Sequence, residues 1–284
     1  MRKLAHIIAP AIVPQSSDLF TAQPVTMETM LIAKRFAQQH GGPEVELYSA
    51  HFAEDATLVP RGFVHTSVLE RSTLDIGRWQ IEAKLPLITD ILTRLHRAAS
   101  DADYLIYTNS DIGLLPNFYV TVDRLIEKGL DAFTINPRWI PAHFTELADI
   151  PIMWAEGDKF RKGWDCFVFR RGAFPQFYLG EACLGAINIG RALILNLIMT
   201  STKFEEFTEL HLTFHIGNDG AWRRSPMQDY AAHNLAVVMQ LLQSLQGTAA
   251  ANHPVVAKIV ETMKARGELD PERFGASGRT SGVS

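Results

Sequence analysis

Short apolar runs alternate with amphipathic stretches over the first 136 residues, and this alternation constrains the fold more than any other feature. Apolar runs of strand length alternate with residues spaced for helices and closed by glycine. Strands that alternate with helices pair in parallel around one sheet, so we expect an α/β protein with a mostly parallel central sheet and helices on both faces. The expected strands are Leu4–Ala9, Val45–Ala50, Tyr104–Thr108 and Leu130–Ile135, and the expected helices are Thr26–Gln39, Gln80–Ala98 and Asn117–Lys128.

The alternation weakens beyond Asn136, and Arg61–Gly77 is polar and irregular. No repeat or change of composition marks a linker, so we expect one domain over residues 1–274, in two halves divided at 136. Residues 275–284 are rich in Gly and Ser, and we expect them to form a disordered tail. The later expected strands are Cys166–Arg170 and Thr208–Ile216, and the later expected helices are Ile187–Met199, Asp229–Leu245 and Val255–Arg266.

Composition excludes several classes of protein. With 27 Lys and Arg against 31 Asp and Glu, the chain lacks the basic surface of a nucleic-acid binder. The densest apolar stretch, Ala186–Met199, contains Asn188, Arg191 and Asn196, so we expect no transmembrane helix. Two cysteines in 284 residues favour reduced thiols and a cytoplasmic protein. No P-loop, dinucleotide-binding glycine loop or nucleophile elbow is present.

The third strand runs directly into Asn109, Ser110 and Asp111. Ligands of open α/β sheets bind beyond the carboxyl ends of the strands, so these residues should border one crevice with Pro10–Asp18 and His51–Asp55. A carboxylate there suits Mg²⁺ or Mn²⁺, whose coordination substrate phosphates can complete. Alternatively, Asp111 caps the next helix or begins a turn.

Two further clusters contain chemically useful side chains. His211, Thr213 and His215 would share one face of a strand, as metal ligands or as ordinary hydrogen-bonded histidines. Trp164 and Asp165 precede an apolar strand. An aromatic ring beside a carboxylate can bind a sugar, although a core strand with an ordinary flanking turn would look the same.

In this order the three clusters resemble the GT-A glycosyltransferases, which have the nucleotide-diphospho-sugar transferase fold, and a bacterial group of glycosyltransferase-like proteins. The resemblance spans Lys3 to about Trp222. The Asp-x-Asp signature of that family is similar to Asn109-Ser110-Asp111, in which the last acidic position is kept. Its acidic or aromatic acceptor motif is similar to Trp164-Asp165. A late histidine that completes the metal shell is similar in place to His215 or, less closely, His211.

The resemblance implies a site assembled from both halves of the chain. Residues 1–136 would bind the nucleotide, and residues 137–274 would bind the acceptor. Asp111 and His215 would hold Mn²⁺ or Mg²⁺ as a Lewis acid. Lys84, Arg71 or Arg78 would add positive charge near the diphosphate. In an inverting mechanism, Asp165 or Asp219 would act as general base. The implied donor-binding residues are Ala9, Pro10, His51, Lys84, Asn109, Ser110 and Asp111.

The activity implied is transfer of a sugar from UDP or GDP to a glycan, lipid or small-molecule acceptor, with inversion or retention left open. One alternative is a nucleotide-sugar-binding module that has lost catalysis, which the replacement of an acidic residue by Asn109 favours. Another is a metal-dependent hydrolase that uses Asp111, His211 and His215. Fold alone does not choose among these three functions.

Overall fold

A seven-stranded sheet forms the centre of the computed structural model, which describes residues 1–156, 159–160, 163–217 and 227–269. Its strands lie in the order β10-β6-β9-β4-β1-β2-β3, and all neighbours are parallel except β9, which is antiparallel to β4 and β6. The predicted α/β fold with a mostly parallel central sheet is therefore confirmed. The strands are β1 (Lys3–Ile8), β2 (Glu44–Ser49), β3 (Phe63–His65), β4 (Tyr104–Thr108), β6 (Ala132–Ile135), β9 (Cys166–Arg170) and β10 (Phe204–Phe207).

A second sheet of four short strands begins just beyond the carboxyl end of β4. Its order is β5-β11-β7-β8, in which β11 is antiparallel to β5 and parallel to β7. Asn109, Ser110 and Asp111 are the whole connection from β4 to β5, so they lie where the two sheets meet. The strands are β5 (Ile112–Leu114), β7 (Arg138–Trp139), β8 (Lys159–Phe160) and β11 (Thr213–His215).

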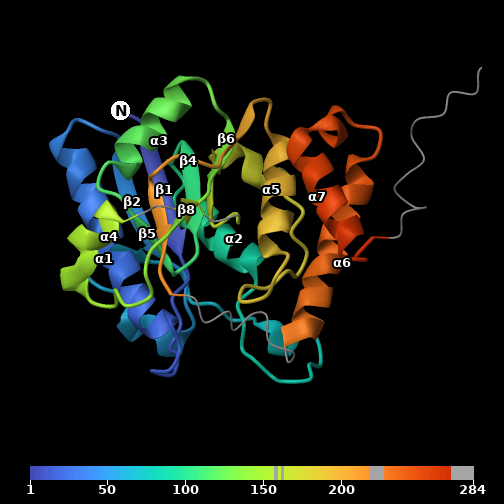
Figure 1. Cartoon of the computed structure of the whole chain (residues 1–284), viewed down its shortest axis with the longest axis horizontal. Helices are drawn as coiled ribbons and strands as arrows, with labels where there is room; N and C mark the ends of the chain where they lie inside the picture. The colour runs from blue at the N-terminus through green and yellow to red at the C-terminus, as the bar shows by residue number, and fades with distance from the viewer. Residues whose placement is uncertain (157–158, 161–162, 218–226, 270–284) are drawn as a thin grey trace, which may run out of the picture.

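Helices cover both faces of the large sheet, with α1 and α3 on one face and α2, α5, α6 and α7 on the other (Figure 1). The short helix α4 packs with the start of α1 against the small sheet. The α-helices are α1 (Leu19–Gln39), α2 (Ile88–Ala98), α3 (Phe118–Glu127), α4 (Ile150–Ala155), α5 (Ile189–Thr200), α6 (Gln228–Leu245) and α7 (Pro254–Ala265). The 3-10 turns are η1 (Ala53–Leu58), η2 (Thr73–Asp75), η3 (Leu147–Asp149), η4 (Arg171–Gln176) and η7 (Ala249–Asn252).

The strands at the centre of the sheet place successive side chains in opposite apolar layers. Leu105 and Tyr107 of β4 pack in the layer of α2 and α5, whereas Tyr104 and Ile106 pack in the layer of α1 and α3. This alternation is the period of two that a strand requires. Both faces of β4 are therefore buried, which explains why its sequence is an apolar run that predicts a strand.

One histidine lies inside this core. His6 of β1 is fully buried, with Nδ1 2.8 Å from the Tyr119 hydroxyl and Nε2 2.9 Å from Thr108 Oγ1. Burial disfavours the charged imidazolium and lowers the pKa of His6 to about 3. Its neutral ring therefore links β1 to β4 and α3 by two hydrogen bonds.

The structure corrects several predicted boundaries. The helix predicted from Gln80 begins at Ile88, because Pro86 is followed by an extended residue and residues 72 and 86 form a β-bridge. The strand predicted over Thr208–Ile216 is confined to β11. Strands β3, β5, β7, β8 and β10 were not predicted, and each has only two to four residues, too few to show a period.

No helix in the described part of the chain has both the length and the apolar content needed to cross a bilayer. Cys166 and Cys183 are buried and form no disulfide. Burial raises the pKa of the Cys183 thiol to about 12, and the pKa of Cys166 rises for the same reason. The tail predicted at residues 275–284 lies outside the described residues.

Candidate functional site

The connection between β4 and β5 is tied to its surroundings by side-chain hydrogen bonds. Ser110 Oγ donates to the Ala9 carbonyl at 2.8 Å, at the carboxyl end of β1. Asn109 Nδ2 donates to Asp165 Oδ1 at 2.9 Å, and the Tyr107 hydroxyl donates to Asn109 Oδ1 at 2.8 Å. These bonds hold the connection to both neighbours of β4 in the sheet.

Pairing of β5 with β11 brings Asp111 to His215. Ile112 lies opposite His215, and the Ile216 amide donates to the Asp111 carbonyl at 2.9 Å. Asp111 Oδ2 is consequently 3.1 Å from His215 Nε2. The other carboxylate oxygen, Oδ1, is buried and accepts no hydrogen bond from the described residues.

The hydrogen bonding of His215 suits a ligand of a cation. Its Nδ1 lies 3.0 Å from the Gly217 carbonyl, which can only accept, so Nδ1 carries a proton. In the neutral ring, Nε2 then directs a lone pair toward Asp111, an arrangement that a cation between them would stabilise. Two ligands at about 2.1 Å from an ion and at right angles lie about 3 Å apart.

A metal bound here would need further ligands from outside this pair. The described residues contain no group of three or more His, Cys, Asp or Glu side chains placed to hold a metal ion. Mg²⁺ in particular takes one or two carboxylates and completes its shell with water and substrate phosphates. Asp111 and His215 could therefore supply at most two ligands of such an ion, and the others would have to come from water or a bound phosphate.

A pocket of about 300 Å³ lies at the carboxyl ends of β1 and β2. The predicted donor-binding residues Ala9, Pro10, His51 and Lys84 all line it. The Lys84 ammonium forms an ion pair with Glu54 and lies 4.1 Å from the centre of the Phe52 ring. Its hydrogen bond to Glu54 lowers the pKa of that carboxyl. Ala9 lines this pocket and accepts the hydrogen bond from Ser110, so the pocket lies next to the β4–β5 connection (Asn109, Ser110 and Asp111), which is called the Asp111 connection below.

A larger hollow of about 1010 Å³ lies at the amino ends of β4 and β6, where Tyr104, Asp131 and Arg170 line it. None of the predicted site residues borders it. Open α/β sheets bind ligands at the carboxyl ends of their strands, so chemistry and topology favour the smaller pocket over the larger volume.

Trp164 and Asp165 are adjacent in the sequence, but their side chains contact different parts of the fold. Asp165 faces Asn109, as described above, and is therefore next to the Asp111 connection. The Trp164 indole donates to Glu206 Oε1 at 2.7 Å, and Trp164 packs closely against the backbone at Gly190. The half-buried ring is thus held between β10 and α5.

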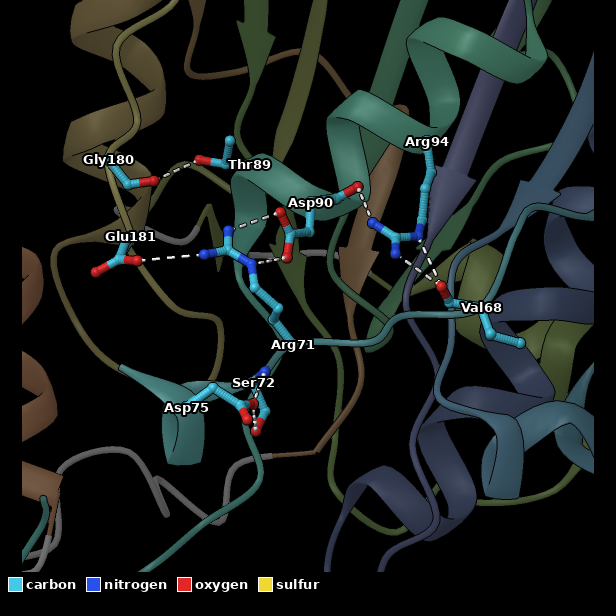
Figure 2. Close-up of polar contacts among 9 residues, drawn as sticks. All are labelled: Val68, Arg71, Ser72, Asp75, Thr89, Asp90, Arg94, Gly180 and Glu181. Carbon is cyan, nitrogen blue, oxygen red and sulfur yellow. Dashed lines mark hydrogen bonds and ion pairs between the residues drawn. The ribbon is translucent and has the colours of Figure 1, made fainter. Parts of the chain in front are cut away.

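The structure does not bring the remaining predicted residues of the described chain into contact with Asp111 or His215. Arg71 Nη2 is 3.0 Å from Asp90 Oδ1, and its Nη1 is 3.3 Å from Glu181 Oε1, so its charge is engaged in ion pairs (Figure 2). His211 lies in the turn before β11, so its predicted place on a strand with His215 is wrong. Burial, together with the positive charge of Arg138, lowers its pKa. Arg78 is exposed, and Asp219 lies outside the described residues.

Trp139 and Gly217 both contact His215, and neither is predicted from the sequence. The ring centroids of Trp139 and His215 are 5.4 Å apart. Gly217 has a φ of +82° and supplies the carbonyl that orients the histidine. The glycine alone hinted at a turn after the strand, whereas nothing in the two-residue strand β7 marked Trp139.

No family model matches this sequence, and no curated protein matches it. Several solved structures have a fold similar to that of this chain. Residues 1–349 of TarS from S. aureus, in complex with UDP-GlcNAc, match with a TM-score of 0.57 and 9% identity, over 98% of this chain and 76% of that chain. The same protein in complex with UDP gives a TM-score of 0.56 and 8% identity over the same shares. The chain therefore has the GT-A, or nucleotide-diphospho-sugar transferase, fold.

Proposed function

We propose that this protein transfers a sugar from a nucleoside-diphosphate donor to an acceptor hydroxyl, with Asp111 and His215 holding Mn²⁺ or Mg²⁺. The observation that carries the proposal is the buried Asp111 oxygen, which accepts no hydrogen bond from the described residues while its partner oxygen faces His215. The adjoining pocket of about 300 Å³ supports it, because a nucleoside bound there would have its diphosphate near the carboxyl ends of the strands, where Asp111 lies.

Each group has a distinct task in this proposal. The cation would act as a Lewis acid that neutralises the departing diphosphate. Ala9, Pro10 and His51 would contact the nucleoside, and Ser110 would hold the Asp111 connection against the pocket. Lys84 would add positive charge by sharing its ammonium between Glu54 and the diphosphate. Asp165, or Asp219, would accept the proton of the acceptor in an inverting reaction.

Thermal shift and turnover test this function together. UDP or GDP with Mn²⁺ should raise the melting temperature, because a ligand that binds only the folded state stabilises it. UDP is the first nucleotide to test, since the TarS structures contain UDP-GlcNAc or UDP. Asp111→Asn should abolish the Mn²⁺-dependent part of the shift and reduce donor turnover by about 100-fold or more.

Asp101→Asn is the matched control, because Asp101 is an exposed carboxylate paired with Lys3 at the amino end of the sheet. This variant should retain the Mn²⁺-dependent shift and full turnover. The function is rejected if no nucleoside diphosphate changes the melting temperature of the wild-type protein with Mn²⁺ present.

A second candidate is a nucleotide-sugar-binding module without catalysis. The observation that favours it is the Asn109 amide, which bonds Tyr107 and Asp165 where a second carboxylate would assist a metal. Nucleotide binding without hydrolysis or transfer of any donor sugar would identify this function. Cleavage of phosphodiesters or esters with no sugar donor would instead identify a metal-dependent hydrolase.

A further inference from the structure

The segment that connects β1 to α1 (residues 9–18) contacts two parts of the candidate site. Near its start, Ala9 and Ile12 line the pocket at the carboxyl ends of β1 and β2. At its end, Asp18 packs against Gly217, because a Cβ at Gly217 would lie 2.5 Å from Asp18 Cβ and 2.8 Å from Asp18 Oδ2. One short segment therefore borders the pocket and also packs on the turn that follows β11.

Helix α1 holds this segment near both of its ends. The buried Gln23 bonds Ala11 twice, since its Oε1 accepts from the Ala11 amide at 2.7 Å and its Nε2 donates to the Ala11 carbonyl at 2.9 Å. The Asp18 carbonyl accepts from the Ala22 amide at 2.9 Å in the first turn of the helix. Asp18 is therefore fixed to α1 on the side of the segment that contacts Gly217.

Glycine is required at position 217 for two separate reasons. Its φ of +82° lies in the left-handed region, which side chains disfavour, and the space that a Cβ would fill is taken by Asp18. The Gly217 carbonyl accepts from His215 Nδ1 at 3.0 Å, while His215 Nε2 lies 3.1 Å from Asp111 Oδ2. The position of this carbonyl therefore fixes which nitrogen of His215 carries the proton and where Nε2 points.

We propose that Gly217 is a positioning residue for the metal ion, because its contact with Asp18 fixes the turn whose carbonyl orients His215. The inference rests on the proposed function, in which Asp111 and His215 hold the ion. The connection that contains Asp111 is tied to the same segment, since Ser110 Oγ donates to the Ala9 carbonyl at 2.8 Å. Residues 9–18 would thus align both metal ligands with the pocket.

Binding of Mn²⁺ in the presence of saturating UDP or GDP tests this role, with the free ion measured by electron paramagnetic resonance. Gly217→Ala should weaken Mn²⁺ binding by about 10-fold or more, the loss typical of a group that orients a ligand histidine. Gly247→Ala is the matched control, because Gly247 has a φ of +77° and no heavy atom lies within 4 Å of a Cβ there. The control should retain the wild-type affinity within about twofold.

Asp18→Gly tests the contact itself, because it removes the atoms that the new methyl group would meet. Substitutions at residues in contact are not additive. Gly217→Ala should therefore cost at least about threefold less Mn²⁺ affinity in the Asp18→Gly background than in the wild type. The double variant also keeps the test open if Gly217→Ala alone does not fold.

The tautomer of His215 gives a readout that needs no metal and that a loss of stability alone would not change. At about pH 8 an ordinary imidazole is neutral, and ¹⁵N chemical shifts distinguish its two tautomers. The signals of His215 are those that disappear in His215→Gln. The wild type and Gly247→Ala should carry the proton on Nδ1, and Gly217→Ala should show a mixture of the two tautomers.

Two results would overturn the role of Gly217 alone. One is the same Mn²⁺ affinity in Gly217→Ala as in Gly247→Ala, and the other is an equal loss from Gly217→Ala in the wild-type and Asp18→Gly backgrounds. A wild-type protein that binds no Mn²⁺ with either nucleotide would overturn the proposed function as well. The tautomer of His215 would then decide separately whether Gly217 orients it, so the two failures are distinguishable.

Discussion

Asn109 and Asp111 lie two positions apart, yet their side chains have different surroundings. The Asn109 amide both accepts from the Tyr107 hydroxyl and donates to Asp165, so its hydrogen bonds join β4 to the start of β9. Asp111 has one oxygen facing His215 and one that accepts nothing from the described residues. The Asn109 side chain is therefore engaged within the fold, and we propose that Asp111 rather than Asn109 contacts the metal ion.

Asn109→Asp tests that distinction. A carboxylate at this position would lie about 3 Å from Asp165, and like charges so close disfavour ionisation of both groups. The pKa of one carboxyl would rise in the folded state, so its stability contribution falls as the pH increases. The variant should lose about 1–3 kcal/mol of unfolding free energy at pH 7.5 and less at pH 4.5. Chemical denaturation at both pH values measures this, and a several-fold gain in Mn²⁺ affinity would contradict it.

His6 makes the stability of the protein depend on pH. Its folded pKa is about 3 and its ordinary value is 6.5, so the unfolded chain binds more protons between these values. Stability is therefore complete above about pH 6.5 and declines as the pH falls toward 3. Between pH 7.5 and pH 5, His6 should contribute a loss of about 2 kcal/mol. His6→Gln should reduce this difference in denaturation experiments, and an unchanged difference would show that His6 is not its source.

At the scale of elements, the pairing of β5 with β11 creates the Asp111–His215 contact. Gly113 of β5 faces Phe214 of β11, and a Cβ at Gly113 would lie 2.3 Å from Phe214 Cζ. The Phe214 ring therefore packs directly on the backbone of Gly113, and a side chain at this position would displace the ring. The glycine is required for its lack of a side chain, since its φ is not in the left-handed region.

Gly113→Ala should disturb both stability and the site. The added methyl group would displace Phe214, at a cost of about 1–3 kcal/mol in unfolding free energy. The shift of β11 should also weaken the Mn²⁺-dependent thermal shift with nucleotide. Gly172→Ala is the matched control, because no heavy atom lies within 4 Å of a Cβ there. A full Mn²⁺-dependent shift in Gly113→Ala would show that the contact does not depend on this packing.

At the scale of the whole molecule, polar contacts join segments that are distant in the sequence. Arg71 links the loop after β3 to Asp90 of α2 and to Glu181, and Thr89 donates to the Gly180 carbonyl at 2.7 Å (Figure 2). Tyr230 of α6 continues the link, since its hydroxyl donates to the Ile81 carbonyl at 2.7 Å and accepts from the Ala83 amide at 2.9 Å. The segment before Lys84 is thereby held against α6.

Tyr230→Phe removes that hydroxyl and keeps the ring stacked on Trp79. Two backbone groups would lose their partner beside a fully buried ring, so the unfolding free energy should fall by about 1–3 kcal/mol. Tyr178→Phe makes the same chemical change at an exposed ring, where the loss should be below about 0.5 kcal/mol. Equal losses in the two variants, measured by urea denaturation, would contradict this role of Tyr230.

How well each helix or strand can be predicted from the sequence depends on its length and on how deeply it is buried. β4 and β9 have the predicted bounds because both are buried on two faces and form unbroken apolar runs. The sequence predicts too early a start for α2, because the apolar residues before Pro86 have the spacing of a helix although the helix begins at Ile88. Strands β5, β7 and β10 are too short for a period to be visible, and they are stabilised by their pairing with distant strands.

The sequence by itself determines the α/β fold and places Asp111 at the carboxyl end of a buried strand, because local hydrophobic periodicity encodes both. It also placed Pro10 and His51 near one crevice, since the carboxyl ends of parallel strands share one edge, whereas Ala9 and Lys84 were implied by the resemblance to the GT-A glycosyltransferases. The resemblance implied that Asp111 and His215 share a site, but only the tertiary structure shows their contact and the contact of Trp139 with His215. Those contacts depend on pairing among the short strands of the second sheet, which no local pattern encodes.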